Sequence, residues 1–184
     1  MESLCLDFLN SENRDWRGDG RSQDQLAEPG WTERLLARWD RDLDPDAGPP
    51  ALHQLIALRS LLRAAVESID RGDGLPPETL VELNRLLGQA PVVRQAVEAT
   101  TAVALILEPV RRDWPWAHAE IAASFVHLLQ TGEWRRLKIC ENPACLWIFY
   151  DESRNRVRRW CDDKACGNLL KVRRFRARRK EGMQ

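Results

Sequence analysis

The sequence predicts an α+β fold, with a mainly helical N-terminal domain that contains a small β-sheet and a smaller C-terminal module. Several segments within residues 1–133 carry apolar side chains at helical spacing, and two short segments favour strands. Residues 134–184 differ in composition, because they contain four of the five cysteines and 15 Lys and Arg against 6 Asp and Glu. Residues 1–133 carry 13 basic and 22 acidic side chains. We therefore divide the chain into domains 1–133 and 134–184.

Two strands are expected in the N-terminal domain. Residues 4–10, LCLDFLN, alternate Leu, Leu and Phe with the intervening residues, which predicts a strand with one buried face. The polar, Gly-rich residues 11–30 that follow predict a loop. Residues 101–110 are rich in β-branched and aliphatic side chains. They predict a second strand, which we expect to lie beside the first.

Helices are expected to fill most of the remaining N-terminal domain. Each apolar stripe lies between residues that commonly start and stop helices. Pro49 and Pro50 precede the longest stripe, Gly72 follows it, and Gly132 follows the last stripe. These patterns predict helices over residues 31–43, 49–71, 76–90 and 115–131.

Four cysteines follow the pattern Cys140-x4-Cys145-x15-Cys161-x4-Cys166. Two close pairs separated by a short excursion can place four thiolates at the corners of a tetrahedron, the geometry that Zn²⁺ takes in structural sites. We therefore predict one structural Zn²⁺ held by these four residues, with no open position for catalysis. The alternative is a set of free or disulfide-bonded cysteines, which the paired spacing in a cytoplasmic protein disfavours.

Composition also bears on location and on the class of protein. No run of eighteen apolar residues occurs, and the N-terminal MESLCLDFLN lacks the basic start of a secretory signal. We therefore expect a cytoplasmic protein with no membrane partner. No P-loop, GxSxG, HExxH or GxGxxG motif is present, and no nucleophile–base pair stands out, so we expect no enzymatic activity.

The segment between the two cysteine pairs, LWIFYDESRNRVRRW, predicts two short strands around a turn at residues 151–155. A helix is expected over residues 166–180. A zinc knuckle, a hairpin and a helix that carries the last ligands is the order of elements in a treble-clef zinc finger. Three apolar helix residues at three-residue spacing are expected to pack on the hairpin, against Trp147, Phe149 or Trp160: Leu169, Val172 and Phe175.

The last helix carries a dense set of basic side chains. Arginine forks match phosphate oxygens, and a helix of this kind fits the major groove, so DNA is the expected partner. Two alternatives stay open: a solvated charged face, and a zinc-stabilised protein-interaction module whose helix docks on an acidic partner or on the acidic half of this chain. The residues expected to contact DNA are Lys171, Arg174 and Arg178 on one helix face, Arg173 beside them, and Arg158 and Arg159 of the hairpin.

A family resemblance supports this interpretation. Residues 140–179 resemble the CGNR zinc finger in the pattern C-x4-C-x-W-I-F-Y-D-x-S-R-N-x-x-R-R-W-C-x4-C-G-N-x-x-K-x-R-R, and LCLDFLN and DWRG resemble the opening of ABATE domains. Proteins with this pair of domains are described as stress-induced transcription regulators. The resemblance implies a treble-clef finger for DNA behind a sensor-like α+β domain of unknown ligand.

The resemblance also assigns roles to individual residues. It implies that the four clustered cysteines hold the zinc, and it places Leu169 where the motif has its arginine. The basic residues that it assigns to nucleic-acid contact are Arg154, Arg158, Arg159, Lys171, Arg173 and Arg174.

Four polar residues are candidates for a pocket that binds an unidentified small molecule. Asp7, Asn10 and Arg17 lie near the end of the first predicted strand, and Arg59 lies on the longest predicted helix. The alternative for each of them is an ordinary role in a loop or on a helix surface.

Overall fold

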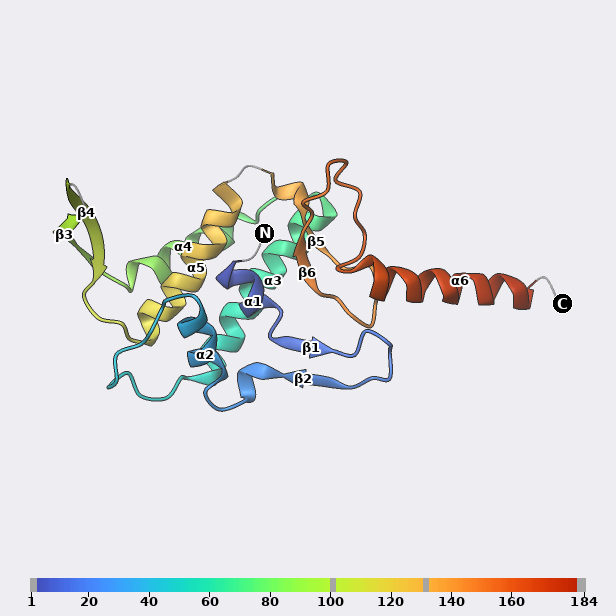
Figure 1. Ribbon diagram of the computed structural model, residues 1–184, viewed down its shortest axis with the longest axis horizontal. Helices are drawn as coiled ribbons and strands as arrows, with labels where there is room; N and C mark the ends of the chain where they lie inside the picture. The colour runs from blue at the N-terminus through green and yellow to red at the C-terminus, as the bar shows by residue number, and fades with distance from the viewer. Residues whose placement is uncertain (1–2, 100–101, 131–132, 182–184) are drawn as a thin grey trace.

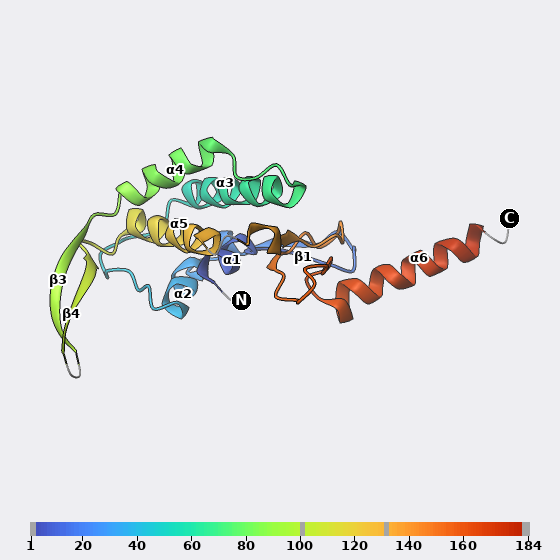
Figure 2. The ribbon, with the colours of Figure 1, turned by 90° about the horizontal axis from the view of Figure 1, so that it is seen from above.

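The computed structural model describes residues 3–99, 102–130 and 133–181. A helical body lies between a protruding two-stranded ribbon at one end and a long projecting helix at the other (Figures 1 and 2). In chain order the elements are α1 (Leu4–Leu9), β1 (Glu12–Arg14), β2 (Ser22–Asp24), η1 (Gln25–Ala27), α2 (Trp31–Arg38), α3 (Leu52–Arg71), α4 (Pro77–Gly88), β3 (Val92–Ala99), β4 (Ala102–Pro109), α5 (Trp114–Gln130), η2 (Trp134–Arg136), β5 (Leu137–Ile139), β6 (Ile148–Tyr150), η3 (Asp163–Gly167) and α6 (Asn168–Glu181).

The predicted α+β class is confirmed, because helices dominate the described chain and its strands form small antiparallel pairs. The helices of the body follow the predicted stripes. Helix α3 ends where Gly72 adopts φ +89°, a left-handed conformation that glycine tolerates best. Helix α2 ends at Arg38, earlier than expected, and Asp40 then takes φ +55°. Gly132, the expected stop of α5, lies outside the described residues.

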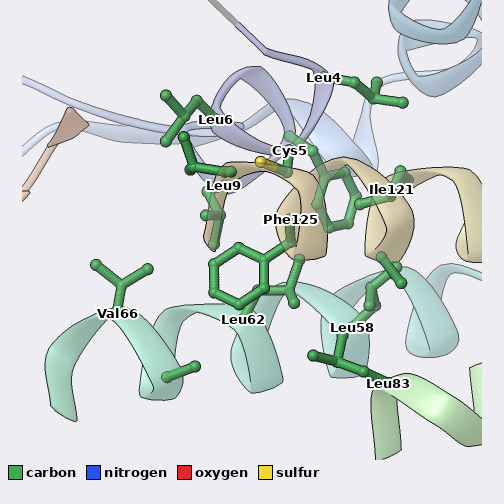
Figure 3. Packing of buried hydrophobic residues seen from close by; sticks show 14 of the residues in the cluster. Leu4, Cys5, Leu6, Leu9, Leu58, Leu62, Val66, Leu83, Ile121 and Phe125 are labelled. Atoms are coloured by element: carbon green, nitrogen blue, oxygen red, sulfur yellow. The ribbon is translucent and has the colours of Figure 1, made fainter. Parts of the chain in front are cut away.

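The core of the body forms where α1, α3 and α5 meet (Figure 3). Phe8, Leu62 and Phe125 are fully buried there, and Leu83 of α4 closes one side. Cys5 is fully buried among them, as expected of a small apolar residue in the body. This layer of helices is the support on which the C-terminal module is built.

The prediction of a strand over residues 4–10 is wrong, because this segment forms the helix α1. The alternating apolar residues are buried, but so are Cys5 and Leu9, which a strand with one buried face would expose. A helix satisfies the backbone of a segment that is buried nearly all round. Asn10 then ends α1, and its side chain turns to the C-terminal module.

The expected sheet is also different. Strand β4 matches the prediction for residues 101–110, but its partner is β3 in a ribbon rather than residues 4–10. Residues 11–30, expected to be a loop, contain the short pair β1–β2 and the turn η1. These strands were missed because the β1–β2 hairpin is polar and largely exposed, so its sequence shows no alternation of apolar residues.

In the C-terminal module, β6 pairs with β5 instead of with the segment that follows it. The hairpin expected between the cysteine pairs is therefore wrong, and residues 151–160 form a strandless loop. The fully buried carboxylate of Asp151 explains the difference. It accepts hydrogen bonds from the backbone N–H groups of Ser153 and Arg158, at 2.9 and 3.0 Å, which ties the loop back on itself.

The projecting helix α6 also departs from expectation. Leu169 is half-buried, but Val172 and Phe175 are 45% and 62% exposed, so the expected packing of these two side chains on the aromatic residues is wrong. The helix projects away from the module (Figure 2), which leaves Val172 and Phe175 exposed to solvent.

The module is attached to the body through a shared core. Leu137 of β5 and Ile148 of β6 are buried in the same cluster as the body helices, and β5 lies against α3. The division into domains 1–133 and 134–184 stays a prediction. Among the described residues, no helix has the length and hydropathy needed to cross a membrane.

Candidate metal centre

The four cysteines Cys140, Cys145, Cys161 and Cys166 come together, with all Sγ atoms within 4.8 Å of one another. The Sγ atoms of Cys145 and Cys161 are 3.6 Å apart, and those of Cys161 and Cys166 are 3.8 Å apart. A tetrahedron with Zn–S bonds of about 2.3 Å has S–S edges of about 3.8 Å. The four thiols are thus already spaced as the ligands of a single zinc ion.

The first cysteine pair lies on a tight knuckle after β5. The backbone N–H of Cys140 donates to the carbonyl of Trp147 at 2.8 Å, and that of Cys145 donates to the carbonyl of Asn142 at 2.8 Å. Leu146 completes the turn at φ +54°. The knuckle therefore reverses the chain so that β6 returns beside β5 with both sulfurs on the inside.

The second pair lies where the loop becomes helical. Asp162 caps η3, because its carboxylate accepts hydrogen bonds from the N–H groups of Lys164 and Ala165 at 2.6 and 2.8 Å. Cys166 is buried in η3, directly before α6 begins at Asn168. A metal held by Cys166 would therefore set the origin and direction of the projecting helix.

Asn142 links the cysteines to the N-terminal body. It is fully buried, and its side-chain amide donates to Sγ of Cys166 at 3.3 Å and to the carbonyl of Trp16 at 2.8 Å. An N–H donor on a ligating sulfur orients the ligand and stabilises its charge. Trp16 also packs against the cysteine cluster, so the loop between β1 and β2 covers the site.

The thiols already favour ionisation at one position. Hydrogen bonds from the side chains of Cys145 and then Cys161 lower the pKa of Cys140, and the same exchange raises the pKa values of Cys145 and Cys161. Cys140 and Cys166 are buried, and the other two are half-buried. Zinc would replace the remaining protons with one shared cation, and four thiolates close its shell to water.

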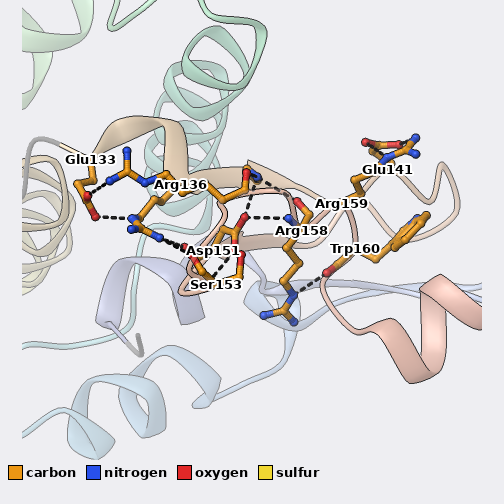
Figure 4. A network of polar contacts seen from close by, with 10 residues as sticks. Glu133, Arg136, Glu141, Asp151, Ser153, Arg158, Arg159 and Trp160 are labelled. Carbon is orange, nitrogen blue, oxygen red and sulfur yellow. Dashed lines mark hydrogen bonds and ion pairs between the residues drawn. The ribbon is translucent and has the colours of Figure 1, made fainter.

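Several basic residues expected to contact DNA serve the module itself (Figure 4). Arg158 donates to the carbonyl of Trp160 at 2.8 Å and lies over the ring of Phe149. Arg159 forms an ion pair with Glu141, with Nε 2.6 Å from the carboxylate. These contacts hold the loop beside the cysteines, so the two arginines are engaged before any ligand arrives.

The remaining basic candidates divide in two. Arg173 donates to the carbonyl of Arg17 at 2.5 Å, which ties α6 to the β1–β2 loop. Arg154 in the loop and Arg174 and Arg178 on α6 are exposed, and none has a hydrogen bond or ion pair with the residues that the structure describes. Lys171, also exposed, lies 5.9 Å from the ring centre of Trp160. The structure therefore leaves four of the seven candidates with side chains turned to solvent.

The four candidate ligand residues of the body do not meet in one place. Asn10 pairs with the backbone of Ile148, and Asp7 accepts a hydrogen bond from the indole of Trp39 at 3.0 Å. Arg17 stacks on Trp16. Arg59 is buried and forms a two-pronged ion pair with Asp24, at 2.7 and 2.6 Å, and that arginine lowers the pKa of the carboxyl. Each of these residues has a structural partner of its own.

A cavity of about 530 Å³ lies elsewhere on the body, beside α1 and α5. Its lining includes the ion pair between Arg41 and Glu120, whose closest atoms are 2.5 Å apart, together with Ser124. None of the four candidate ligand residues lines it. Sequence reasoning missed these residues because Arg41 follows α2 whereas Glu120 and Ser124 belong to α5, and the three form no motif.

A helical body joined to a four-thiolate site defines a zinc-finger protein with a single structural zinc. Residues 2–132 match the ABATE family, which is described as "Putative stress-induced transcription regulator", and residues 136–179 match the CGNR zinc finger. Because the ABATE match covers more than half of the chain, the protein belongs to this family. The resemblance seen in the sequence is therefore confirmed. No curated protein matches the chain.

Proposed function

We propose that this protein is a transcription regulator that binds DNA through α6, the helix whose origin is set by the zinc site. The observation that carries the proposal is the position of α6, which projects away from the body (Figure 1). Its exposed Arg174 and Arg178 have no hydrogen bond or ion pair within the described chain. A free basic helix about 14 residues long can follow a groove of duplex DNA and contact phosphates on both sides.

The arrangement favours DNA over docking of α6 on the acidic half of the same chain. That alternative requires Arg174 and Arg178 to pair with carboxylates of residues 1–133, and α6 instead points away from the body. An acidic partner protein is the remaining competitor. The zinc has a structural role in this proposal, the chain performs no catalytic step, and the reducing cytoplasm keeps the four thiolates available to the metal.

The test is binding of the zinc-loaded full chain to fluorescent duplex DNA as salt is raised. Four phosphate contacts predict a slope of log K against log salt near −3.6, so affinity falls about 150-fold between 50 and 200 mM salt. Replacing Arg174 and Arg178 by glutamine should reduce the slope by about two. A salt-independent affinity, or the same slope in the double variant, would contradict the proposal.

The matched control removes the same charge elsewhere. Arg71 and Arg111 are exposed on the body, with side chains 63% and 64% accessible. Arg71→Gln with Arg111→Gln leaves the net charge equal to that of the α6 variant and should leave the slope unchanged. A loss of affinity in both variants would show that net charge, rather than α6, attracts the DNA.

We further propose that ligand sensing, which the family resemblance implies, takes place in the cavity beside α1 and α5. It combines apolar walls with an ion pair and the hydroxyl of Ser124, as small-molecule sites commonly do. A thermal-shift screen of a metabolite library should find compounds that stabilise the wild type but not Ala123→Trp, whose indole fills the cavity. Compounds that stabilise both proteins equally would bind elsewhere and would contradict this assignment.

A further inference from the structure

The ribbon formed by β3 and β4 leaves the body at the end opposite α6 (Figures 1 and 2). Its eight residue pairs run antiparallel from Val92 opposite Pro109 to Ala99 opposite Ala102. The two strands contact each other far more than any other element. A two-stranded ribbon without a covered face is only marginally stable in water.

One face of the ribbon is an ordered grid of six side chains. Cross-strand partners lie on the same face, and so do residues two apart along a strand. The grid consists of Arg94 opposite Leu107, Ala96 opposite Leu105 and Glu98 opposite Val103. Its β4 side is apolar yet 77%, 70% and 64% exposed at Val103, Leu105 and Leu107, whereas Ala104 and Ile106 on the other face are half-buried. Contiguous exposure of this kind marks an interaction surface.

The charges of one grid are complementary to those of a second, identical grid that faces it. Arg94 and Glu98 lie two residues on either side of Ala96, and neither has an ion pair with the residues that the structure describes. A twofold axis along the row of Ala96 and Leu105 exchanges the two ends of the grid. It would bring Arg94 against Glu98 of a second copy, and Leu107 against Val103 of that copy.

We propose that a second copy of this chain covers the ribbon face, grid against grid across this twofold axis. An interface of this type is isologous, because the same residues serve both partners. An unrelated partner would have to supply a matching arrangement of charges, whereas a second copy supplies it by symmetry.

The area agrees with a reversible dimer. The hydrophobic transfer energies of Val and Leu correspond to about 100 Å² for each exposed side chain. Three such side chains and the three remaining grid members give about 500 Å² on each copy. The total of about 1,000 Å² lies below the area of stable specific interfaces, about 1,200–2,000 Å², and in the range of weak, transient ones. Dimerisation should therefore depend on protein concentration.

Sedimentation equilibrium of the zinc-loaded full chain tests the proposal. The wild type should shift from monomer to dimer as concentration rises, and Leu105→Arg should stay monomeric because it sets two arginines against each other on the axis. Val81 of α4 is 71% exposed and provides the control, since Val81→Arg should dimerise like the wild type. A wild type that stays monomeric, or a Leu105→Arg variant that still dimerises, would overturn the proposal.

A charge exchange tests the face-to-face geometry without removing any apolar side chain. Arg94→Glu alone, or Glu98→Arg alone, places like charges together and should raise the dimer dissociation constant at least about tenfold. The two substitutions in one chain restore opposite charges and should bring the constant back to within about threefold of the wild type. A double variant as weak as the single variants would overturn the proposal.

Discussion

Asn10 joins the body to the zinc module, and its replacement should measure that attachment. Its side-chain amide donates to the carbonyl of Ile148 at 2.8 Å and accepts from the N–H of the same residue at 2.8 Å. Both residues are buried, with 5% and 0% of their surfaces exposed. Asn10 thus acts as one more strand residue beside β6, although it belongs to the end of α1.

Asn10→Ala removes both bonds and leaves a buried N–H and a buried carbonyl without partners. Each unsatisfied group costs about 1–3 kcal/mol, so we expect the free energy of unfolding to fall by about 3 kcal/mol. With a urea dependence of about 2 kcal/mol per molar, the unfolding midpoint should fall by about 1.5 M. Far-UV circular dichroism and release of zinc should report the same lowered midpoint, because β6 is fixed to both parts.

Asn155→Ala is the matched control, because Asn155 is exposed in the loop and should change stability by less than about 0.5 kcal/mol. An Asn10→Ala variant with the wild-type midpoint would refute the structural role. That result, together with weakened binding of a small molecule, would instead favour the ligand-pocket role considered from the sequence.

Three further predictions concern the zinc site, Asp151 and Arg59. The protein should hold one zinc per chain, and Cys161→Ser or a chelator should remove the dichroism of α6 while that of α3 and α5 remains. Asp151→Asn should cost about 3 kcal/mol in a urea titration, because it leaves the ammonium of Lys138, 2.8 Å away, without its buried carboxylate. Burial raises the pKa of Asp151, but hydrogen bonds led by that from Lys138 outweigh burial, and the net pKa lies below its ordinary value. The contribution of Asp151 to the free energy of unfolding is therefore complete above about pH 4 and is lost as the pH falls toward the lowered pKa. Arg59→Met should lower the thermal midpoint by an amount equivalent to about 2 kcal/mol, and NMR titration should show the pKa of Asp24 returning toward its ordinary value.

The long helices could be predicted because their signals are local. The stripe of α3 and its stop at Gly72 depend on spacing and backbone freedom within one segment. Helix α1 could not be assigned in the same way, because its six residues fit both periods: Leu4, Leu6 and Phe8 alternate, while Cys5 and Leu9 are four apart. The segment forms a helix because it is buried on several sides, and this burial depends on α5 and β6, which pack against it.

The ribbon shows a second limit of sequence reasoning. β3 mixes Arg, Gln and Glu with Val and Ala, because neither of its faces is fully buried within one chain. The sequence predicted β4 from its aliphatic content, but it did not predict β3, the strand with which β4 pairs. If a second copy covers the grid, the apolar residues of β4 are buried by a surface of that copy, which the sequence of a single chain does not reveal.

The metal ligands could be predicted from the paired spacing of the cysteines together with the CGNR resemblance, but the residues that support them could not. Asn142 reaches the carbonyl of Trp16, 126 residues away in the chain, and its importance is visible only when the two segments meet. The same holds for Arg158 and Arg159, whose sequence context is that of a DNA-contacting pair. Their hydrogen bonds and ring contacts show that a basic residue near a zinc finger can be part of its scaffold.

Position 169 illustrates how placement changes the weight of a sequence difference. The CGNR motif has an arginine where this chain has Leu169, so this chain lacks the contact that the arginine makes in the family. Leu169 is half-buried in the first turn of α6, whereas Arg174 and Arg178 are exposed farther along the helix. The difference at position 169 therefore lies in the first turn of α6, and the exposed charges farther along the helix are unaffected by it.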